Sequence, residues 1–388
     1  MKHLYIAILI LAFLSSCTDK DTTLPEDAEQ TIVNNITVAR NTRTDDPADE
    51  SNGILTNNDF SEGSILYISQ MGTTEPPNFP ANTTSDNSEK NLYVYKWYEN
   101  DEADWDYEYN FKPIGSSNPL NWSTIKSLGN VGNAFSLYAM YFPEEQKIRY
   151  DVELDQSEWK NFHKSDIMGA YHATSSLFSR LRFRLFHLMV YLRVKLYVPV
   201  IKTEDNGYSG FGENALKTAK VLNAIPNFDI EWRTNRTSDS DAPLTYSKGD
   251  RKDIIMYQHE NLRQITLDNV ADFYPQGNIT EDEVIEYNFS VLFPAQEFSK
   301  NNNILCFQLQ TQGQEKDDKV VNYYFAASQR IGSDDSGFNL TQGTLQWLYL
   351  YLPRTGNKTI LISAKKLPWI DASTDMTVTE EKTTTEEN

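Results

Sequence analysis

Apolar and polar residues alternate with a period of two along most of this chain of 388 residues. Such alternation is typical of half-buried β-strands, whose successive side chains point to opposite faces of a sheet. We expect strands at residues 65–68, 92–98, 105–111, 135–142, 181–200, 228–232, 254–257, 285–293, 304–309, 320–326, 345–352 and 359–363. Only residues 157–168 and 211–222 are predicted to be helical. Many short strands separated by turns predict an all-β fold of two β-sandwich domains in tandem.

The longest apolar region, residues 181–200, changes the phase of its alternation near Phe186 and His187. A bulge or a sharp bend at this point would return the apolar side chains to the inner face. His187 then lies on an apolar strand, where we expect a core histidine satisfied by a hydrogen bond. Four basic residues take the outward positions and exclude a transmembrane helix: Arg182, Arg184, Arg193 and Lys195.

The chain begins with a short positive stretch and the apolar run Leu4–Leu14, which has the length of a signal peptide and is too short for a permanent membrane anchor. The run ends in Leu14-Ser15-Ser16-Cys17, which resembles a bacterial lipobox. We therefore predict a lipoprotein signal peptide at residues 1–16 and lipidation of Cys17. The alternative is an ordinary secretory leader whose cysteine is incidental or pairs with Cys306.

Composition narrows the classes of function. The 55 acidic and 35 basic residues give a net charge of −20, which argues against nucleic-acid binding, because phosphate contacts require clustered Lys and Arg. Two cysteines exclude a disulfide scaffold, and five histidines leave little for a metal site. His163 and His172 lack the spacing of a metal pair. We predict no catalytic site, no metal and no cofactor.

The length favours two domains, because single cores stop growing at about 250–300 residues. The glycine-rich stretch 204–213 is the best internal boundary. We predict an acidic tether with a first strand at 17–43, sandwich domains at 44–203 and 204–370, and an acidic Thr- and Glu-rich tail at 371–388.

Several segments together resemble the fimbrillin family of Bacteroidales pilus subunits. They are Asn121-Trp122 followed by residues 135–143, Asp155-Gln156-Ser157 followed by residues 165–170, residues 182–190 with His187, Thr341-Gln342-Gly343, and Pro368-Trp369. The similarity covers most of residues 31–370. Phe186 is an insertion relative to the common spacing of the family's strand, and the tail is more acidic than usual.

The resemblance implies two transthyretin-like β-sandwich domains and a lipoprotein precursor on the outer membrane. It also implies that an Arg-specific surface protease removes a first strand. The groove that this strand leaves would then accept a strand from another pilus subunit. The candidate residues are Ile32, Val33, Ile36 and Val38 for the first strand, Arg40 and Arg43 for cleavage, and Ile370, Met376 and Val378 for the donated strand.

A second interpretation comes from the aromatic residues that alternate with polar ones between Tyr93 and Phe111. They predict a hairpin, whose aromatic side chains could stack on sugars or on one another. The alternative function is therefore a non-polymerising surface lipoprotein that binds glycans. The segment before Arg40 separates the two interpretations, because only a polymerising subunit needs a removable strand.

Overall fold

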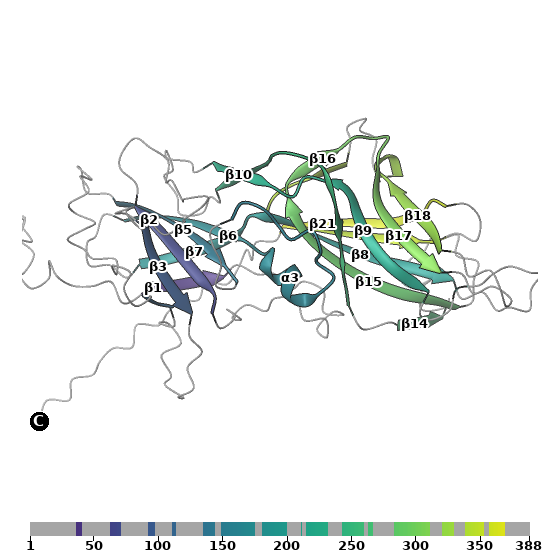
Figure 1. Ribbon diagram of the computed structural model, residues 1–388, viewed down its shortest axis with the longest axis horizontal. Coiled ribbons are helices and arrows are strands. Elements are labelled where there is room, and N and C mark those ends of the chain that lie inside the picture. The colour runs from purple at the N-terminus through teal and green to yellow at the C-terminus, as the bar shows by residue number, and fades with distance from the viewer. Residues whose placement is uncertain are drawn as a thin grey trace, which may run out of the picture.

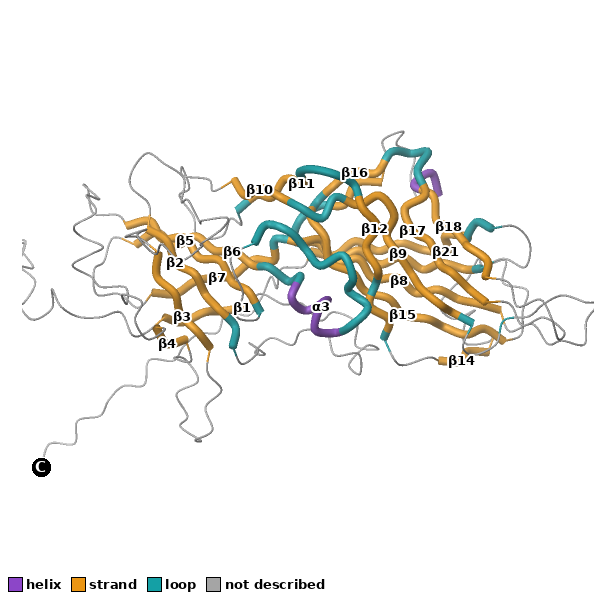
Figure 2. Tube along the Cα trace, in the orientation of Figure 1, coloured by secondary structure: helices purple, strands orange, loops and turns teal. Residues whose placement is uncertain are grey.

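The computed structural model describes residues 36–40, 63–70, 92–97, 111–113, 135–143, 149–174, 181–199, 211, 215–231, 243–259, 263–266, 283–310, 320–329, 338–352 and 357–368. Strands dominate this part of the chain (Figure 2), so the predicted all-β class is confirmed. Its only helices are α3 (Trp159–Lys164) and the 3-10 turn η3 (Ala327–Gln329). None of the described helices is long and apolar enough to cross a membrane.

Several predicted site residues lie outside the described residues. They are Leu14, Ser15, Ser16, Cys17, Ile32, Val33, Arg43, Ile370, Met376 and Val378.

The first seven strands form one sheet with the order β1-β7-β6-β5-β2-β3-β4. The bounds are Ile36–Arg40 for β1, Ile65–Gln70 for β2, Leu92–Trp97 for β3, Phe111–Pro113 for β4, Phe135–Phe142 for β5, Met168–Thr174 for β6 and Leu181–His187 for β7. β6 and β7 share only two residue pairs, at the end of β7. β1 and β7 are therefore joined to the rest of the sheet at one end alone.

Two further sheets make up the larger unit. One has the order β12-β9-β17-β18, and the other has the order β13-β15-β8-β20-β21, with β14 also paired to β15. The bounds are Met189–Pro199 for β8, Leu216–Ala224 for β9, Lys252–Ile255 for β12, Tyr257–Gln258 for β13, Arg263–Thr266 for β14, Glu283–Pro294 for β15, Asn303–Gln310 for β17, Val320–Ala326 for β18, Thr344–Tyr351 for β20 and Ile360–Pro368 for β21.

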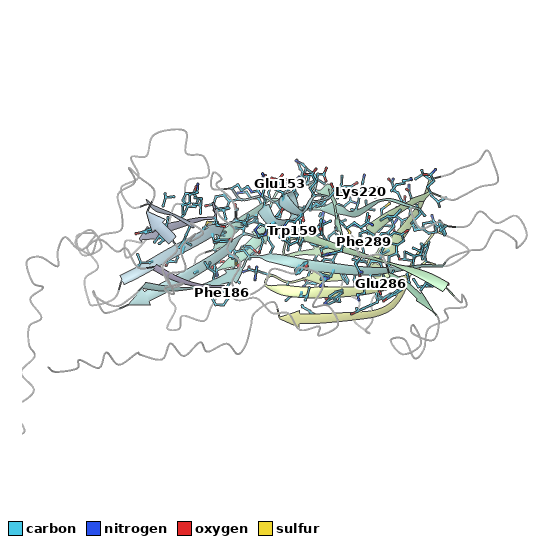
Figure 3. The ribbon with its side chains drawn as sticks, turned by 90° about the horizontal axis from the view of Figure 1, so that it is seen from below. Glu153, Trp159, Phe186, Lys220, Glu286 and Phe289 are labelled. Carbon is cyan, nitrogen blue, oxygen red and sulfur yellow. The ribbon has the colours of Figure 1, made fainter. Side chains whose placement is uncertain are left out.

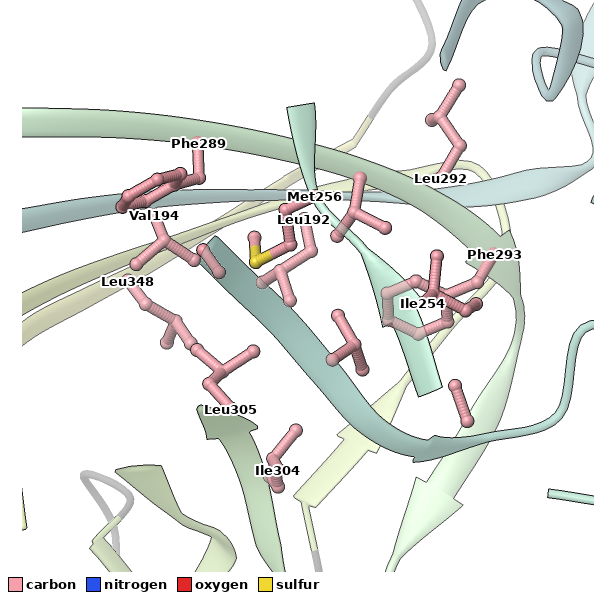
Figure 4. Close-up of a cluster of buried hydrophobic side chains, with 14 of the residues drawn as sticks. Leu192, Val194, Ile254, Met256, Phe289, Leu292, Phe293, Ile304, Leu305 and Leu348 are labelled. Carbon is pink, nitrogen blue, oxygen red and sulfur yellow. The ribbon is translucent and has the colours of Figure 1, made fainter. Parts of the chain in front are cut away.

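Side chains from both of these sheets meet in one buried core, as expected for a sandwich. Leu192 and Val194 come from β8 and Phe289 from β15, and they meet Ile254 from β12 and Leu305 from β17 (Figure 4). Two small antiparallel sheets also contribute residues to this core. They pair β10 (Phe228–Glu231) with β11 (Leu244–Ser247), and β16 (Gln296–Phe298) with β19 (Phe338–Leu340).

The chain passes from the first sheet to the larger unit at Leu188. β7 ends at His187, Leu188 belongs to no strand, and β8 begins at Met189 and pairs with β15 and β20. The predicted break near Phe186 and His187 is therefore present. It marks a change of sheet rather than a bulge within one sheet, and it comes earlier in the chain than the predicted boundary at residue 204.

Two sequence predictions in this region are wrong. Residues 211–222 were expected to be helical, but strand β9 runs from Leu216 to Ala224 between β12 and β17, so long-range pairing overrides the local helical preference. Arg193 was expected to face outward, yet it is 1% exposed, and its guanidinium lies 4.0 Å from the ring centroid of Trp347. The outer face of this part of the sheet is therefore covered.

Candidate functional site

β1 is the edge strand of the first sheet. It pairs with β7 alone, in parallel, and the register sets Ile36 opposite Leu181 and Arg40 opposite Leu185. Arg40 is the last residue of β1, and Val38 lies in its middle. A cut directly after Arg40 would therefore separate the whole of β1 from the fold without breaking any other described ladder.

The last residue of β7 is a buried histidine that holds this end of the strand in place. His187 Nδ1 lies 2.6 Å from Asp166 Oδ1, and both side chains are fully buried. The backbone adds a second contact between the same two segments, because the N–H of Leu188 donates to the carbonyl of Ile167 at 3.0 Å. The prediction of a core histidine satisfied by a hydrogen bond is confirmed. Its partner, Asp166, was not identified from the sequence as such.

We call residues 149–167 the connector, because they link β5 to β6 of the first sheet while binding the larger unit. The N–H of Phe228 donates to the carbonyl of Tyr150 at 2.9 Å, and the N–H of Val152 donates to that of Pro226 at 3.1 Å. Farther along, the N–H of Ile255 donates to the carbonyl of Leu154 at 2.8 Å. In Figure 1, α3 of the connector lies between the two groups of strands.

The side chain of Gln156 binds the connector to β15 of the larger unit. It is fully buried, and its amide pairs with both backbone groups of Leu292 in β15. Nε2 donates to the Leu292 carbonyl at 2.7 Å, and Oε1 accepts from the Leu292 N–H at 2.9 Å. β13 pairs with β15 at Phe289 and Ser290, so the amide of Gln156 occupies the same edge of β15 farther along.

Aromatic rings of α3 add to the attachment. The ring of Phe162 lies 5.6 Å from that of Tyr257 and 5.8 Å from that of Tyr191. Trp159 packs on Tyr257 and His163 but remains 40% exposed, near the middle of the molecule in Figure 3.

The turn before β20 contacts the chain around Leu188 and Met189, where β7 passes into β8. We call this region the junction. The N–H of Gly343 donates to the carbonyl of Met189 at 3.0 Å. Gln342 Oε1 accepts from the N–H of Thr245 at 2.7 Å, and the Thr245 hydroxyl donates to the carbonyl of Leu188 at 3.1 Å. Gly343 has a φ of +62°, which favours glycine.

Residues far apart in the sequence therefore meet at one junction. Three of the segments that carried the family resemblance contribute to it, through Gln156, through Asp166 with His187, and through Gln342 with Gly343. In the sequence these segments are recognisable as a pattern, but their contacts are not. The available signal was the presence of isolated polar residues beside apolar strands.

His163, His172 and Cys306 lie in separate elements of the described part of the chain. Among them, no group of three or more His, Cys, Asp and Glu could hold a metal ion. His163 is buried in α3, whereas His172 lies in β6 opposite Leu137. The thiol of Cys306 is buried, and burial raises its pKa, which lowers its reactivity.

The structure describes the two ends of the predicted aromatic hairpin. β3 pairs with β4, and Trp97 lies opposite Phe111. Residues 98–110 lie outside the described residues. Tyr95, which belongs to the predicted aromatic platform, is fully buried and cannot stack on a sugar in this arrangement.

No known family model matches this chain, and no curated protein sequence matches it. Among solved structures, a candidate cell adhesion protein from Bacteroides uniformis aligns over 89% of this chain and 100% of its own, with a TM-score of 0.45 and 10% identity. A fimbrial protein from Bacteroides vulgatus aligns over 86% and 99%, with a TM-score of 0.39 and 10% identity.

The tip fimbrial protein Mfa3 from Porphyromonas gingivalis, with a C-terminal truncation, aligns over 86% of this chain and 100% of its own. Its TM-score is 0.32 and its identity is 10%. These neighbours are adhesion and fimbrial proteins. TM-scores and identities this low do not by themselves carry a function to this chain, so the function must be argued from its own residues.

Proposed function

We propose that this protein is a structural subunit of a cell-surface fimbria, exported as a lipoprotein, trimmed after an arginine and assembled by strand addition. The observation that carries the proposal is β1, a parallel edge strand that is paired on one side only and ends at Arg40. A strand in this position can leave without disturbing its neighbours' other ladders.

Loss of β1 would turn β7 into the new edge of the sheet. The backbone groups of Leu181–Leu185 that face β1 would then lack partners. Each ladder hydrogen bond contributes a net ~1 kcal/mol, and an exposed row of such groups is a template for an incoming strand. Removal of β1 would therefore favour the binding of another strand to the exposed edge of β7.

The junction supports the same function. A subunit of a fibre must transmit load between its two ends, and here Gln156 binds the connector of the first sheet to β15 of the larger unit. His187 with Asp166 holds the end of β7 within the first sheet, and Gln342 holds β11 beside the start of β20 within the larger unit. The trimmed subunit would keep these contacts, because none of them involves β1.

The remaining parts of the proposal rest on the sequence. Lipidation of Cys17 would hold the precursor at the outer membrane, and an Arg-specific surface protease would cut after Arg40 or Arg43. The tail residues Ile370, Met376 and Val378 share one parity and would supply the donated strand to another subunit.

The test is a double variant, Arg40→Ala with Arg43→Ala, compared with wild type in the native cell. The variant should remain an untrimmed, lipidated monomer on the cell surface, whereas wild type should form SDS-resistant ladders. Arg251→Ala removes an exposed arginine directly before β12 of the larger unit and serves as the matched control. Ladders of equal intensity in the double variant would overturn the proposal, and N-terminal sequencing of wild type identifies the cleaved bond.

A further inference from the structure

A lysine and an asparagine lie directly opposite each other in the ladder between β8 and β15. They are Lys195 and Asn288. Opposed side chains of an antiparallel pair point to the same face of the sheet, with Cβ atoms about 4.5–5.5 Å apart. Glu286 also lies on β15, one alternation before Asn288, so it shares that face (Figure 3). An amine, a primary amide and a carboxyl group therefore meet on one face of the sheet.

The carboxylate of Glu286 contacts both other groups through one oxygen. Asn288 Nδ2 donates to Glu286 Oε1 at 3.0 Å, and Lys195 Nζ lies 3.5 Å from the same oxygen. The other polar atom of the amide, Asn288 Oδ1, is buried and has no hydrogen-bond partner in the described part of the chain. A buried acceptor without a partner costs free energy, so its presence here requires an explanation.

The three groups are shielded from water. Glu286 and Asn288 are each 3% exposed, and the side chain of Lys195 is 15% exposed. The ring of Trp347 lies on the same face, with its centroid 5.6 Å from Lys195 Nζ. Burial penalises an ammonium beside a carboxylate more than it penalises a neutral amine beside a neutral acid. Transfer of a proton from the lysine to the glutamate is therefore easier here than in water.

We propose that Lys195 and Asn288 form an isopeptide bond, with Glu286 as the catalytic residue, so that β8 and β15 become covalently joined. The reaction happens once in each folded chain and needs no other protein. It does not depend on trimming of the first strand, because all three residues belong to the larger unit.

The geometry supplies each step of the reaction. Glu286 Oε1 takes a proton from the Lys195 ammonium, and the resulting amine attacks Cγ of Asn288. The new C–N bond forms as the electron pair of the carbonyl moves to Oδ1, and the bond from Cγ to Nδ2 then breaks. The lysine nitrogen loses a second proton, so that one of the two completes the departing ammonia and the other remains on Glu286. No oxidant or cofactor is consumed.

The buried amide oxygen distinguishes this reaction from an ordinary ion pair. An ion pair accounts for the contact of Lys195 with Glu286, but it leaves Asn288 Oδ1 without a partner. Once protonated, Glu286 becomes a donor beside this acceptor. A hydrogen bond to Oδ1 would draw electrons from Cγ and stabilise the charge that develops on the oxygen during the attack.

The bond would fix two long strands in register. β8 pairs with β15 from Met189 to Pro199, and the pair of Lys195 and Asn288 lies within this ladder. A covalent link at this point would prevent β8 from sliding along β15. It would also restrict the unfolded chain, which raises stability as a disulfide does.

The test is mass spectrometry of the denatured protein. The recombinant chain from Thr18, which lacks only the predicted leader and the lipidated cysteine, should be lighter than its sequence by the mass of one ammonia molecule. A digest should contain a branched peptide that joins Lys195 to Asn288, and the same peptide should occur in a digest of the protein from native cells. A wild-type chain with the full mass of its sequence would overturn the proposal.

Three variants assign the roles, with circular dichroism as the check that each one folds. Glu286→Gln keeps the size of the side chain but cannot carry the proton, and Lys195→Arg keeps the positive charge but offers no primary amine, so both should have the full mass. Asn322→Ala is the matched control, because Asn322 Oδ1 is also a buried acceptor without a partner in the described part of the chain but lies opposite Gln308. This control should still lose ammonia.

Two outcomes would contradict the assignment of roles. Complete loss of ammonia in Glu286→Gln would show that Glu286 is not the catalytic residue. Loss of one water molecule in wild type, with a branched peptide that joins Lys195 to Glu286, would show that the carboxyl group is attacked instead of Asn288. The mass of wild type alone decides whether the bond to Asn288 exists, even if a variant does not fold.

Discussion

Replacement of Gln156 tests whether the connector binds the larger unit as strongly as its geometry indicates. Gln156→Leu keeps the size of the side chain but removes both hydrogen bonds to Leu292 and a third, from Nε2 to the carbonyl of Glu153 at 3.0 Å. The N–H and carbonyl of Leu292 would then remain buried without these partners.

Each buried polar group left unsatisfied costs about 1–3 kcal/mol, so the two groups of Leu292 together predict a loss of about 3–5 kcal/mol in the free energy of unfolding. For a unit of about 200 residues, this corresponds to a fall in Tm of roughly 10 °C. Urea denaturation and calorimetry measure the two quantities. Ser157→Ala changes the exposed neighbour of Gln156 and should cost less than about 0.5 kcal/mol.

Gln156→Glu separates lost hydrogen bonds from lost packing. The introduced carboxylate can accept from the N–H of Leu292 but cannot donate to its carbonyl, and its charge is buried, so the variant should be less stable than Gln156→Leu at pH 7. Burial raises the pKa of such a group, so its stability should recover as the pH falls and the protonated carboxyl donates as the amide did. A loss below about 1 kcal/mol in both variants would refute the reasoning.

Three further predictions concern other parts of the chain. Burial, and then the Asp229 carboxylate, raise the pKa of Tyr150 to about 12, so its phenol stays protonated in the fold while that of the unfolded chain ionises above pH 10. Stability should be complete below pH 10 and fall toward pH 12, by about 1.4 kcal/mol at pH 11, and Tyr150→Phe should remove this loss in urea titrations at successive pH values. A Cβ at Gly169 would lie 3.0 Å from Pro243 Cγ, so Gly169→Ala should lower the free energy of unfolding by about 1–3 kcal/mol. Urea titration measures this change, and an unchanged value would show that the neighbouring side chains move aside. Cys17→Ala should abolish incorporation of labelled palmitate, and equal labelling would contradict the lipidation site.

The sequence predicted strands well where a short run is rich in apolar and aromatic residues. Residues 135–142 and 320–326 form β5 and β18 with the predicted bounds, because such runs favour strands whether one face or both faces are buried. It failed for β9, whose residues have no continuous alternation and are held by neighbours far along the chain. Pairing of this kind is a property of the whole fold and leaves no local signal.

The site was predictable to a similar degree. The family resemblance and the position of Arg40 suggested a removable first strand, but not that β1 would pair in parallel with β7. His187 was recognised as a core residue because it lies on an apolar strand, whereas Asp166 and Gln156 lie on irregular segments with no periodicity to reveal their partners. Arg193 was misplaced because alternation reveals which face a side chain occupies and not what covers that face.

The path of the chain through the junction bears on how a fibre of such subunits would withstand tension. β7 receives the added strand in the proposed assembly, and it continues through Leu188 directly into β8. β8 lies between β15 and β20 and pairs with β15 along its whole length, from Met189 to Pro199. A pull along β7 therefore loads the hydrogen bonds of β8 together, in shear, rather than opening them one at a time. The connector adds a second attachment at Gln156, so force reaches the larger unit along two paths.

In the stretching of single molecules, Gln156→Leu should therefore lower the unfolding force, whereas Tyr246→Phe, an exposed change in β11, should leave it unchanged. Equal forces for Gln156→Leu and wild type would mean that β8 alone carries the load.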